Sequence, residues 1–144
     1  TAHFADWRAF MALIAVGCGA AALDAAGEWA WSREIAERPL ARVAAVVEKF
    51  GRHKLALDLA RRAAVAALEA PAGERPELAA AAKVAATDAG FAAVDFAIDV
   101  LGARGVMPGA GLEKRMRDLR AMRIADGPND VLTAHLGRSF LGRR

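Results

Sequence analysis

Three breaks that contain glycine and proline divide this sequence into long stretches of mainly apolar residues. The breaks are Pro71-Ala72-Gly73, the segment from Gly102 to Gly109, and Asp126-Gly127-Pro128. Glycine and proline interrupt regular structure because glycine lacks a side chain and proline lacks a backbone N–H group. Between the breaks, apolar residues recur every three or four positions, which predicts helices rather than strands.

Five helical segments follow from this pattern. Hydrophobic residues make up 56% of the chain, tyrosine is absent, and alanine, the strongest helix former, is abundant. Long helices joined by short links favour an antiparallel arrangement. We therefore predict one all-α domain over residues 1–144, an antiparallel helical bundle of four main helices and a short one. The predicted segments run from about Trp7 to Arg33, from Pro39 to about Leu68, from Pro76 to Leu101, from about Gly111 to Arg123, and from Pro128 onward.

Some residues inside the predicted helices conflict with a plain apolar stripe. Gly17 and Gly19 each cost the first helix about 1 kcal/mol relative to alanine, which close approach of a neighbouring backbone would compensate. Lys54 and Arg61 interrupt the stripe of the second helix, so either they extend to solvent or the stripe shifts. The inner side of the last helix is predicted to carry Val131, Leu132, His135 and Leu136.

The first segment contains an uncharged run from Ala9 to Leu23 that follows Arg8. A signal peptide has a similar pattern, but here the helical spacing continues past the run. The run is also shorter than the roughly 20 residues of a membrane span. We therefore expect a core helix in a cytoplasmic protein with no membrane contact. Its one cysteine, Cys18, is expected to be buried, and the tryptophans to pack in the core or an interface: Trp7, Trp29 and Trp31.

Charge and histidine spacing disfavour two classes of function. The net charge of +3 suits an acidic or nucleotide-bearing partner, or none. Nucleic-acid binding is disfavoured because no dense basic stretch with interleaved aromatic residues occurs. The histidines are His3, His53 and His135, and none has a metal-ligand spacing to another ligand residue. We expect no metal site.

The segment Asp126-Gly127-Pro128 has two readings from its residues alone. An acidic residue before a helix is stabilised by the helix N-terminus by about 0.3–1 kcal/mol, and proline suits the first helical position. The segment is then a plain helix entry. The other reading is that any chemistry of this chain centres on this segment.

Three C-terminal stretches resemble the C-terminal helical domain of the acyl-CoA dehydrogenases. They are Gly102-Ala103-Arg104-Gly105, the run from Leu112 to Arg120, and Ile124-Ala125-Asp126-Gly127-Pro128. In order, they are similar to the family's G-G-x-G turn, its E-x-x-x-R-D-x-R helix and its I-x-E-G-T loop. Two stretches further upstream are more weakly similar to the family. Ala30–Leu40 resembles its pattern A-x-x-R-x-x-F-G-x-P-L, and Phe4–Arg8 resembles its pattern F-D-x-x-R.

This resemblance implies α,β-desaturation of an acyl-CoA thioester. In the family a carboxylate removes the α-proton, and the β-hydride passes to FAD. The resemblance assigns the catalytic base to Asp126, which stands where the family has Glu. It assigns substrate binding to Arg8, near the CoA nucleotide, and to Gly127. The backbone N–H of Asp126 is expected to polarise the thioester carbonyl.

The resemblance also assigns residues to the cofactor FAD. Arg33 matches an arginine that reaches the FAD diphosphate of a neighbouring subunit, and Asp99, Gly102 and Ala103 match residues that touch that same flavin. Asp99 stands where the family has Gln, Ala103 where it has Gly, and Pro128 where it has Thr. Two further positions match residues beside the bound FAD: Pro128 and Asp130.

The family's N-terminal helical domain and middle β-domain have no counterpart in these 144 residues. We therefore interpret the chain as the C-terminal domain of a larger dehydrogenase, or as a subunit whose partner supplies the rest, and expect it to be inactive alone. The expected partners are an acyl-CoA substrate, further copies in a dimer or tetramer, and an electron-transfer flavoprotein. The alternative is a non-catalytic helical module for oligomerisation or for binding a partner helix.

Overall fold

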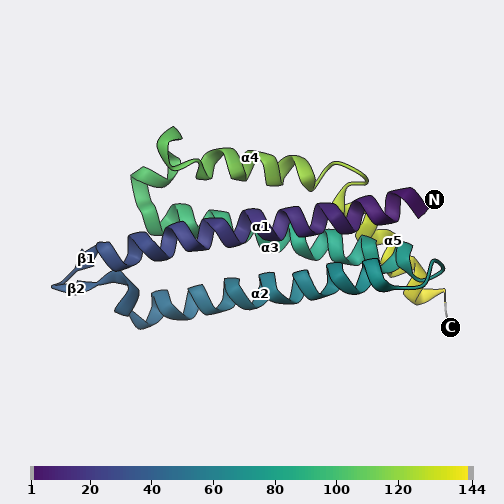
Figure 1. Cartoon of the computed structure of the whole chain (residues 1–144), viewed down its shortest axis with the longest axis horizontal. Coiled ribbons are helices and arrows are strands. Elements are labelled where there is room, and N and C mark those ends of the chain that lie inside the picture. Colours follow the sequence, from purple (N-terminus) through teal and green to yellow (C-terminus); the bar gives the residue numbers. More distant parts are fainter. Residues whose placement is uncertain (1, 143–144) are drawn as a thin grey trace.

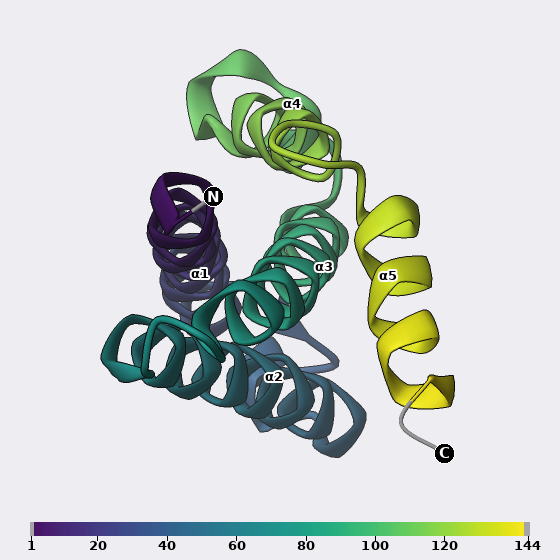
Figure 2. The ribbon, with the colours of Figure 1, turned by 90° about the vertical axis from the view of Figure 1, so that its right-hand side faces the viewer.

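The computed structural model describes residues 2–142, with side chains from Phe4 onward, and is almost entirely helical. α1, α2 and α3 run side by side in alternating directions, and α4 lies along them (Figure 1). Seen along the bundle, α3 lies between α1, α2, α4 and α5, and α5 crosses the direction of the others (Figure 2). The predicted all-α antiparallel bundle is confirmed. Its helices are α1 (Ala2–Ser32), α2 (Ala44–Glu69), α3 (Arg75–Leu101), α4 (Leu112–Met122) and α5 (Asn129–Leu141).

α1 and α3 pack closely because small residues line both sides of their contact. A Cβ atom on Gly19 would lie 3.0 Å from the Cα of Gly90, and one on Gly90 would lie 2.6 Å from the carbonyl oxygen of Ala15. The prediction that a close backbone explains Gly19 is confirmed. For Gly17 it is wrong, since that residue is exposed and has no atom near its missing side chain.

The buried line of α2 shifts away from the two charged residues that interrupted its predicted stripe. Lys54 and Arg61 are exposed, and the buried residues are Leu57, Ala60, Ala64 and Ala67. Small alanines replace the larger residues of the predicted stripe, so α2 approaches its neighbours closely at these positions.

Several apolar and aromatic residues lie further outward than the sequence predicted. On α5, Leu132 is buried, but Val131 and His135 are exposed, so the inner face is narrower than predicted. Trp7 and Trp31 are 50% and 60% exposed, so of the two predicted places, core or interface, the core is excluded for them. Cys18 is only half-buried. The core gains its contacts from alanine, which leaves room for few large side chains.

The segment between α1 and α2 forms a small hairpin, which the sequence did not predict. The strands β1 (Glu34–Ile35) and β2 (Arg38–Pro39) pair antiparallel, and a 3₁₀ turn over Leu40–Arg42 leads into α2. Pro39 therefore does not open the second helix as predicted, because its backbone is extended, with ψ 138°. Ala36 and Glu37 both have positive φ, as a two-residue hairpin turn requires, but neither is a residue that favours it.

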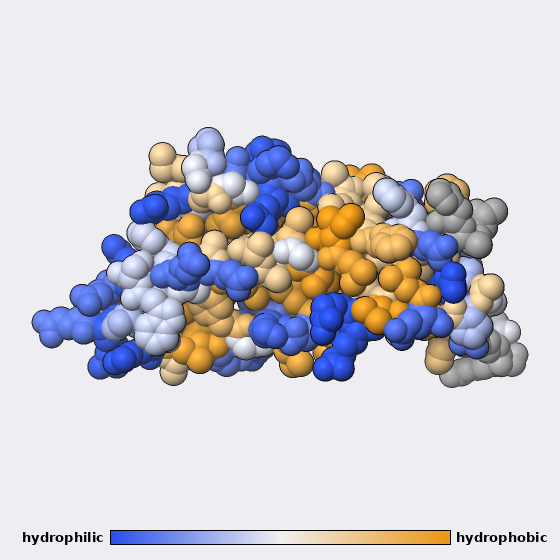
Figure 3. Space-filling view, in the orientation of Figure 1, coloured by the Kyte–Doolittle hydropathy of each residue, from blue (hydrophilic) through white to orange (hydrophobic). Residues whose placement is uncertain are grey.

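α1 is longer and more apolar than its uncharged run suggested. The run Ala9–Leu23 is part of a longer helical stretch, Phe4–Ser32, which as a whole has the length and composition of a membrane-crossing helix. Half of its most apolar part is buried in the bundle. Its other face is exposed, and apolar side chains gather along it (Figure 3). This face includes Phe4, Trp7, Phe10 and Ile14.

Three further elements matter for the sites below. The 3₁₀ turns Gly102–Val106 and Pro108–Ala110 connect α3 to α4. Gly102 ends α3 with a φ of +60°, and its N–H group donates to the carbonyl oxygens of Ile98 and Asp99. The loop from Arg123 to Pro128 then connects α4 to α5.

Candidate functional site

The α4–α5 loop has a left-handed backbone at its centre. Asp126 has a φ of +52° and Gly127 a φ of +103°. Asparagine, aspartate and glycine are the residues that adopt this region most readily. A Cβ atom on Gly127 would also lie 3.1 Å from Leu132 Cδ2, so the position favours glycine for space as well. Pro128 lies one residue before the first helical position predicted for it, because its extended backbone, with ψ 142°, caps α5.

Two buried or half-buried cations hold consecutive carbonyl groups of this loop. Arg8 Nε of α1 donates to the carbonyl oxygen of Asp126 at 2.9 Å. Lys83 Nζ of α3 donates to the carbonyl oxygen of Gly127 at 2.9 Å. The Asn129 N–H group also donates to the carbonyl oxygen of Arg123 at 3.0 Å, which closes the loop. The loop therefore has a fixed backbone, held from α1 and α3.

The half-buried Asp126 side chain is left free by these contacts. Among the described residues, its carboxylate makes no hydrogen bond or ion pair, and its backbone N–H group has no acceptor. An unpaired carboxylate on a fixed backbone can accept a proton from a bound molecule. The free N–H group beside it can donate to a developing oxyanion.

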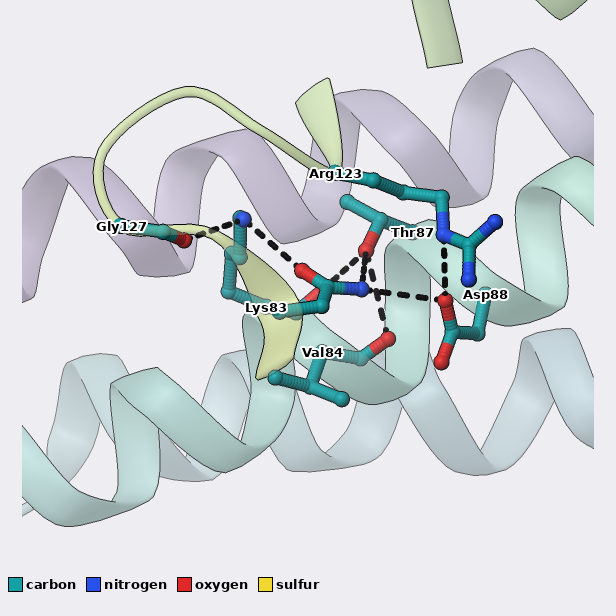
Figure 4. A network of polar contacts seen from close by, with 7 residues as sticks. Lys83, Val84, Thr87, Asp88, Arg123 and Gly127 are labelled. Atoms are coloured by element: carbon teal, nitrogen blue, oxygen red, sulfur yellow. Dashed lines mark hydrogen bonds and ion pairs between the residues drawn. The ribbon is translucent and has the colours of Figure 1, made fainter. Parts of the chain in front are cut away.

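A buried polar network supports the loop from below, between α3 and α5 (Figure 4). Lys83 Nζ also donates to Asn129 Oδ1 at 2.8 Å, and Asn129 Nδ2 donates to Thr87 Oγ1 at 2.9 Å and to Asp88 Oδ1 at 3.0 Å. Thr87 in turn donates to the Lys83 carbonyl oxygen at 2.9 Å. Arg123 Nε lies 2.8 Å from Asp88 Oδ1 as an ion pair at the edge.

Burial lowers the pKa of Lys83 below its usual value. The nearby cations Arg8 and Arg123 act in the same direction, and Asp126 and Asp88 oppose them. The sequence reasoning missed this network. The sequence feature that indicated it was a pair of polar residues, Lys83 and Thr87, one turn apart on the otherwise apolar third helix. Nothing in the sequence related this pair to Asn129.

A second group of predicted residues lines a surface hollow of about 630 Å³ at the hairpin end. The hollow contains Arg33, Asp99, Gly102 and Ala103. No hydrogen bond or ion pair within the described part of the chain engages the Arg33 guanidinium or the Asp99 carboxylate. The hollow also contains Lys49, Arg104 and Trp29, and the Arg104 guanidinium lies 4.5 Å from the Trp29 ring centre.

The chemistry of this hollow fits an anionic ligand with a flat part. Its cations outnumber its one carboxylate, Asp99, and the unpaired Arg33 can bind a phosphate in bidentate fashion. Space is open where Gly102 would carry a Cβ atom, so a ligand can approach its backbone closely. The carboxylate of Asp99 would repel an anion, but the positive charges of Arg33, Lys49 and Arg104 outweigh this repulsion.

The predicted site residues thus fall into two groups, at opposite ends of the bundle (Figure 1). The hollow brings together Arg33, Asp99, Gly102 and Ala103. The α4–α5 loop brings together Arg8, Asp126 and Gly127, with Pro128 and Asp130 exposed beside them. Among the residues with described side chains, which exclude His3, no cluster of metal-ligand residues forms.

Comparison with known proteins identifies the fold and the family. Residues 1–141 match the acyl-CoA dehydrogenase C-terminal domain. The chain belongs to the acyl-CoA dehydrogenase family. The probable acyl-CoA dehydrogenase YngJ of Bacillus subtilis is 31% identical over 136 residues, which is 93% of this chain and 36% of that protein.

Solved structures agree with this assignment. The butyryl-CoA dehydrogenase of Megasphaera elsdenii superposes with a TM-score of 0.84 and 26% identity, over 93% of this chain and 36% of that one. A chain in the structure of the electron transferring flavoprotein of Acidaminococcus fermentans gives a TM-score of 0.84 with 25% identity, over the same shares. The chain spans about a third of the length of these relatives and corresponds to the C-terminal domain of the family.

Proposed function

We propose that this domain supplies the catalytic base of an FAD-dependent acyl-CoA dehydrogenase that α,β-desaturates an acyl-CoA thioester. Asp126 is the base. The observation that carries the proposal is the contrast within one residue: the Asp126 carbonyl is held by Arg8 at 2.9 Å, whereas its carboxylate has no partner among the described residues. The chain alone is expected to be inactive, because it spans 36% of the YngJ relative.

Each group of the loop has a distinct task in this reaction. The Asp126 carboxylate takes the α-proton, and the free N–H group of the same residue donates to the thioester oxygen as negative charge develops there. The backbone at Gly127 would lie beside the substrate, and Arg8 would be on the side of the CoA moiety. Aspartate is one methylene shorter than the family's glutamate, so the substrate α-carbon must approach the loop more closely.

Members of the acyl-CoA dehydrogenase family use FAD. When bound, FAD accepts the β-hydride. In this chain Arg33 would bind its diphosphate, and the backbone at Gly102 and Ala103 would lie against it together with Asp99. Pro128 and Asp130, at the other end of the bundle, would lie beside a second flavin. Two flavins per chain imply that neighbouring copies share their sites, so we propose a homo-oligomer.

The test replaces Asp126 in the complete polypeptide that carries this domain. Asp126→Asn is expected to lower the rate of flavin reduction by acyl-CoA by about 10²–10⁴-fold, the usual effect of a general base. Asp126→Glu, which introduces the family's residue, should retain activity. The matched control is Asp24→Asn, at an exposed position of α1. A native rate in Asp126→Asn would exclude Asp126 as the base.

A second candidate function is non-catalytic oligomerisation, favoured by the apolar outer face of α2. Leu55 and Leu59 are 60% and 58% exposed one turn apart, and Val47 is 51% exposed on the same helix. Sedimentation of the chain at micromolar concentration should then show self-association, and Leu55→Lys with Leu59→Lys should abolish it. A monomer in the unaltered chain argues against this function.

We further propose an electron-transfer flavoprotein as the electron acceptor of the complete enzyme, supported by the likeness to a chain in such a structure. The proposed location is the cytoplasm. This proposal is supported by the cysteine content, because Cys18 has no second cysteine in the sequence with which to form a disulfide.

A further inference from the structure

Lys83 is the largest side chain without exposed surface among the described residues. A buried ammonium group loses its hydration and is stabilised only through directed contacts. Here its two hydrogen bonds go to the Gly127 carbonyl oxygen and to Asn129 Oδ1, at 2.9 and 2.8 Å. Both acceptors are neutral. Both lie where the α4–α5 loop that carries Asp126, here called the base loop, joins α5.

The charges that act on Lys83 come from α1, from α3 itself and from the α4–α5 loop. Arg8 of α1 and Arg123 of the loop disfavour its charge, and Asp88 of α3 and Asp126 favour it. None of the four is hydrogen-bonded to Nζ. An apolar side chain of similar volume would fill this position without the cost of burying a charge. The contribution specific to lysine is therefore the direction of its two hydrogen bonds.

Two hydrogen bonds, one from Lys83 and one from Arg8, fix the two peptide groups that follow the Asp126 Cα atom. Lys83 fixes the Gly127 carbonyl, and Arg8 fixes the Asp126 carbonyl one residue earlier. Both residues have a left-handed backbone, so the chain on the C-terminal side of the Asp126 Cα cannot change its conformation without breaking one of these bonds. Asn129 links the same lysine to Thr87, so the start of α5 cannot move independently of α3.

We propose that Lys83 is a positioning residue for the base loop: through Gly127 and Asn129 it holds the Asp126 carboxylate and N–H group in their working direction. This inference rests on the proposed function of Asp126. Lys83 itself touches neither substrate nor flavin.

The experiment compares Lys83→Met and Lys83→Gln in the complete polypeptide. Methionine fills the space without donors, whereas glutamine keeps an amide that can donate to the same oxygens. Lys83→Met should lower the rate of flavin reduction on the order of 10²-fold, as expected for a misplaced catalytic group. Its substrate Kd should change far less, since the lost interaction acts on the reacting geometry. Lys83→Gln should recover a large part of the rate.

A second readout does not depend on activity. Hydrogen exchange of the Asn129 amide, which donates to the Arg123 carbonyl oxygen, reports on closure of the loop. It should be faster in Lys83→Met and close to unaltered in Lys83→Gln, while amides of α3 near Gly90 keep their protection. The matched control is Leu57→Ala, which removes a buried side chain beside Gly19 and leaves the loop intact.

The outcomes separate the two hypotheses. Unaltered exchange at Asn129 in Lys83→Met, or an equal loss of rate in Leu57→Ala, would overturn the positioning role. A failure of the base assignment would appear instead as a native rate in Asp126→Asn, with normal protection of the loop. If Lys83→Met does not fold, Lys83→Gln decides: recovery of the rate together with protection of the Asn129 amide supports the positioning role, and a loss of rate with unaltered exchange overturns it.

Discussion

The two ends of α3 hold their neighbouring loops by opposite means. At the Lys83 end, buried side chains donate to loop carbonyls, and the network includes Lys83, Thr87 and Asn129. At the Gly102 end, the chain turns back onto its own helix, and a Cβ atom on Gly105 would lie 2.8 Å from both the Cα and the carbonyl oxygen of Ile98. One end depends on polar groups and the other on the absence of side chains.

This difference determines which side chains remain unpaired at each end of α3. At the Lys83 end the protein's own donors satisfy the loop, so the Asp126 carboxylate remains available. At the Gly102 end the turn is held by backbone packing, so Arg33 and Asp99 remain unpaired in the hollow. The first end should therefore respond to loss of a polar atom, and the second to added volume.

The largest expected effect is Gly105→Ala. Its new methyl group would overlap the Ile98 backbone, which cannot move without unwinding the end of α3. We expect a loss of about 3 kcal/mol in the free energy of unfolding, at the upper part of the range for overpacking. Urea unfolding of the chain measures it. Gly109→Ala, with open space at its Cβ position, is the control, and an equal loss in both variants would refute the packing argument.

The second prediction concerns the polar end and keeps the volume constant. Thr87→Val removes the hydroxyl group that accepts from Asn129 and donates to the Lys83 carbonyl. Asn129 keeps Asp88 as an acceptor, so we expect a loss of about 1 kcal/mol, the net value of a hydrogen bond. Urea unfolding should show no comparable loss for Thr133→Val on the exposed face of α5. Equal stabilities of the two variants would mean that the network contributes nothing.

Sequence reasoning predicted features that local chemistry determines and missed those that depend on distant partners. The bundle and its breaks followed from apolar spacing, and Gly19 from its position in a helix. The hairpin was missed because Ala36 and Glu37 carry no signal for positive φ. Gly17 and Gly19 look alike in the sequence, and only the packing of α3 distinguishes them.

The candidate site shows the same division. The motifs indicated the Asp126 loop and the Gly102 turn, because both are short and local. That Lys83 would reach Gly127, and that Arg8 would reach Asp126, required the helices to be placed in three dimensions. The sequence assignments themselves stay predictions until the variants of Asp126 are measured.

The third prediction tests the hollow through its exposed aromatic contact. Arg104→Leu removes a guanidinium 4.5 Å from the Trp29 ring centre. The loss should be about 0.5–1 kcal/mol, as for a cation–π contact near the surface. Arg104→Lys keeps the charge and should lose less in urea unfolding. If leucine and lysine lower stability equally, the contact is not electrostatic.

The smallest expected effect distinguishes the two ends by pH. His53 stacks on Phe96, which borders the hollow, with ring centres 4.7 Å apart, and burial lowers its pKa below 6.5. Burial likewise lowers the pKa of Lys83 below 10.5. In each case the unfolded chain binds more protons between the lowered pKa and the usual value. Stability should therefore rise with pH through each window, near and below 6.5 for His53 and below 10.5 for Lys83.

Two substitutions separate these windows. His53→Phe keeps an aromatic ring against Phe96 and should flatten the pH dependence of unfolding on the acid side only. Lys83→Met should flatten it on the alkaline side only. Urea unfolding at intervals from pH 5 to 10 gives the slope of the free energy of unfolding against pH for each variant. A difference in stability that is the same at every pH does not affect this comparison. An unaltered acid slope in His53→Phe would mean that His53 does not cause the pH dependence on the acid side. A stability that falls with rising pH in either window would mean that folding does not lower the pKa of the group concerned.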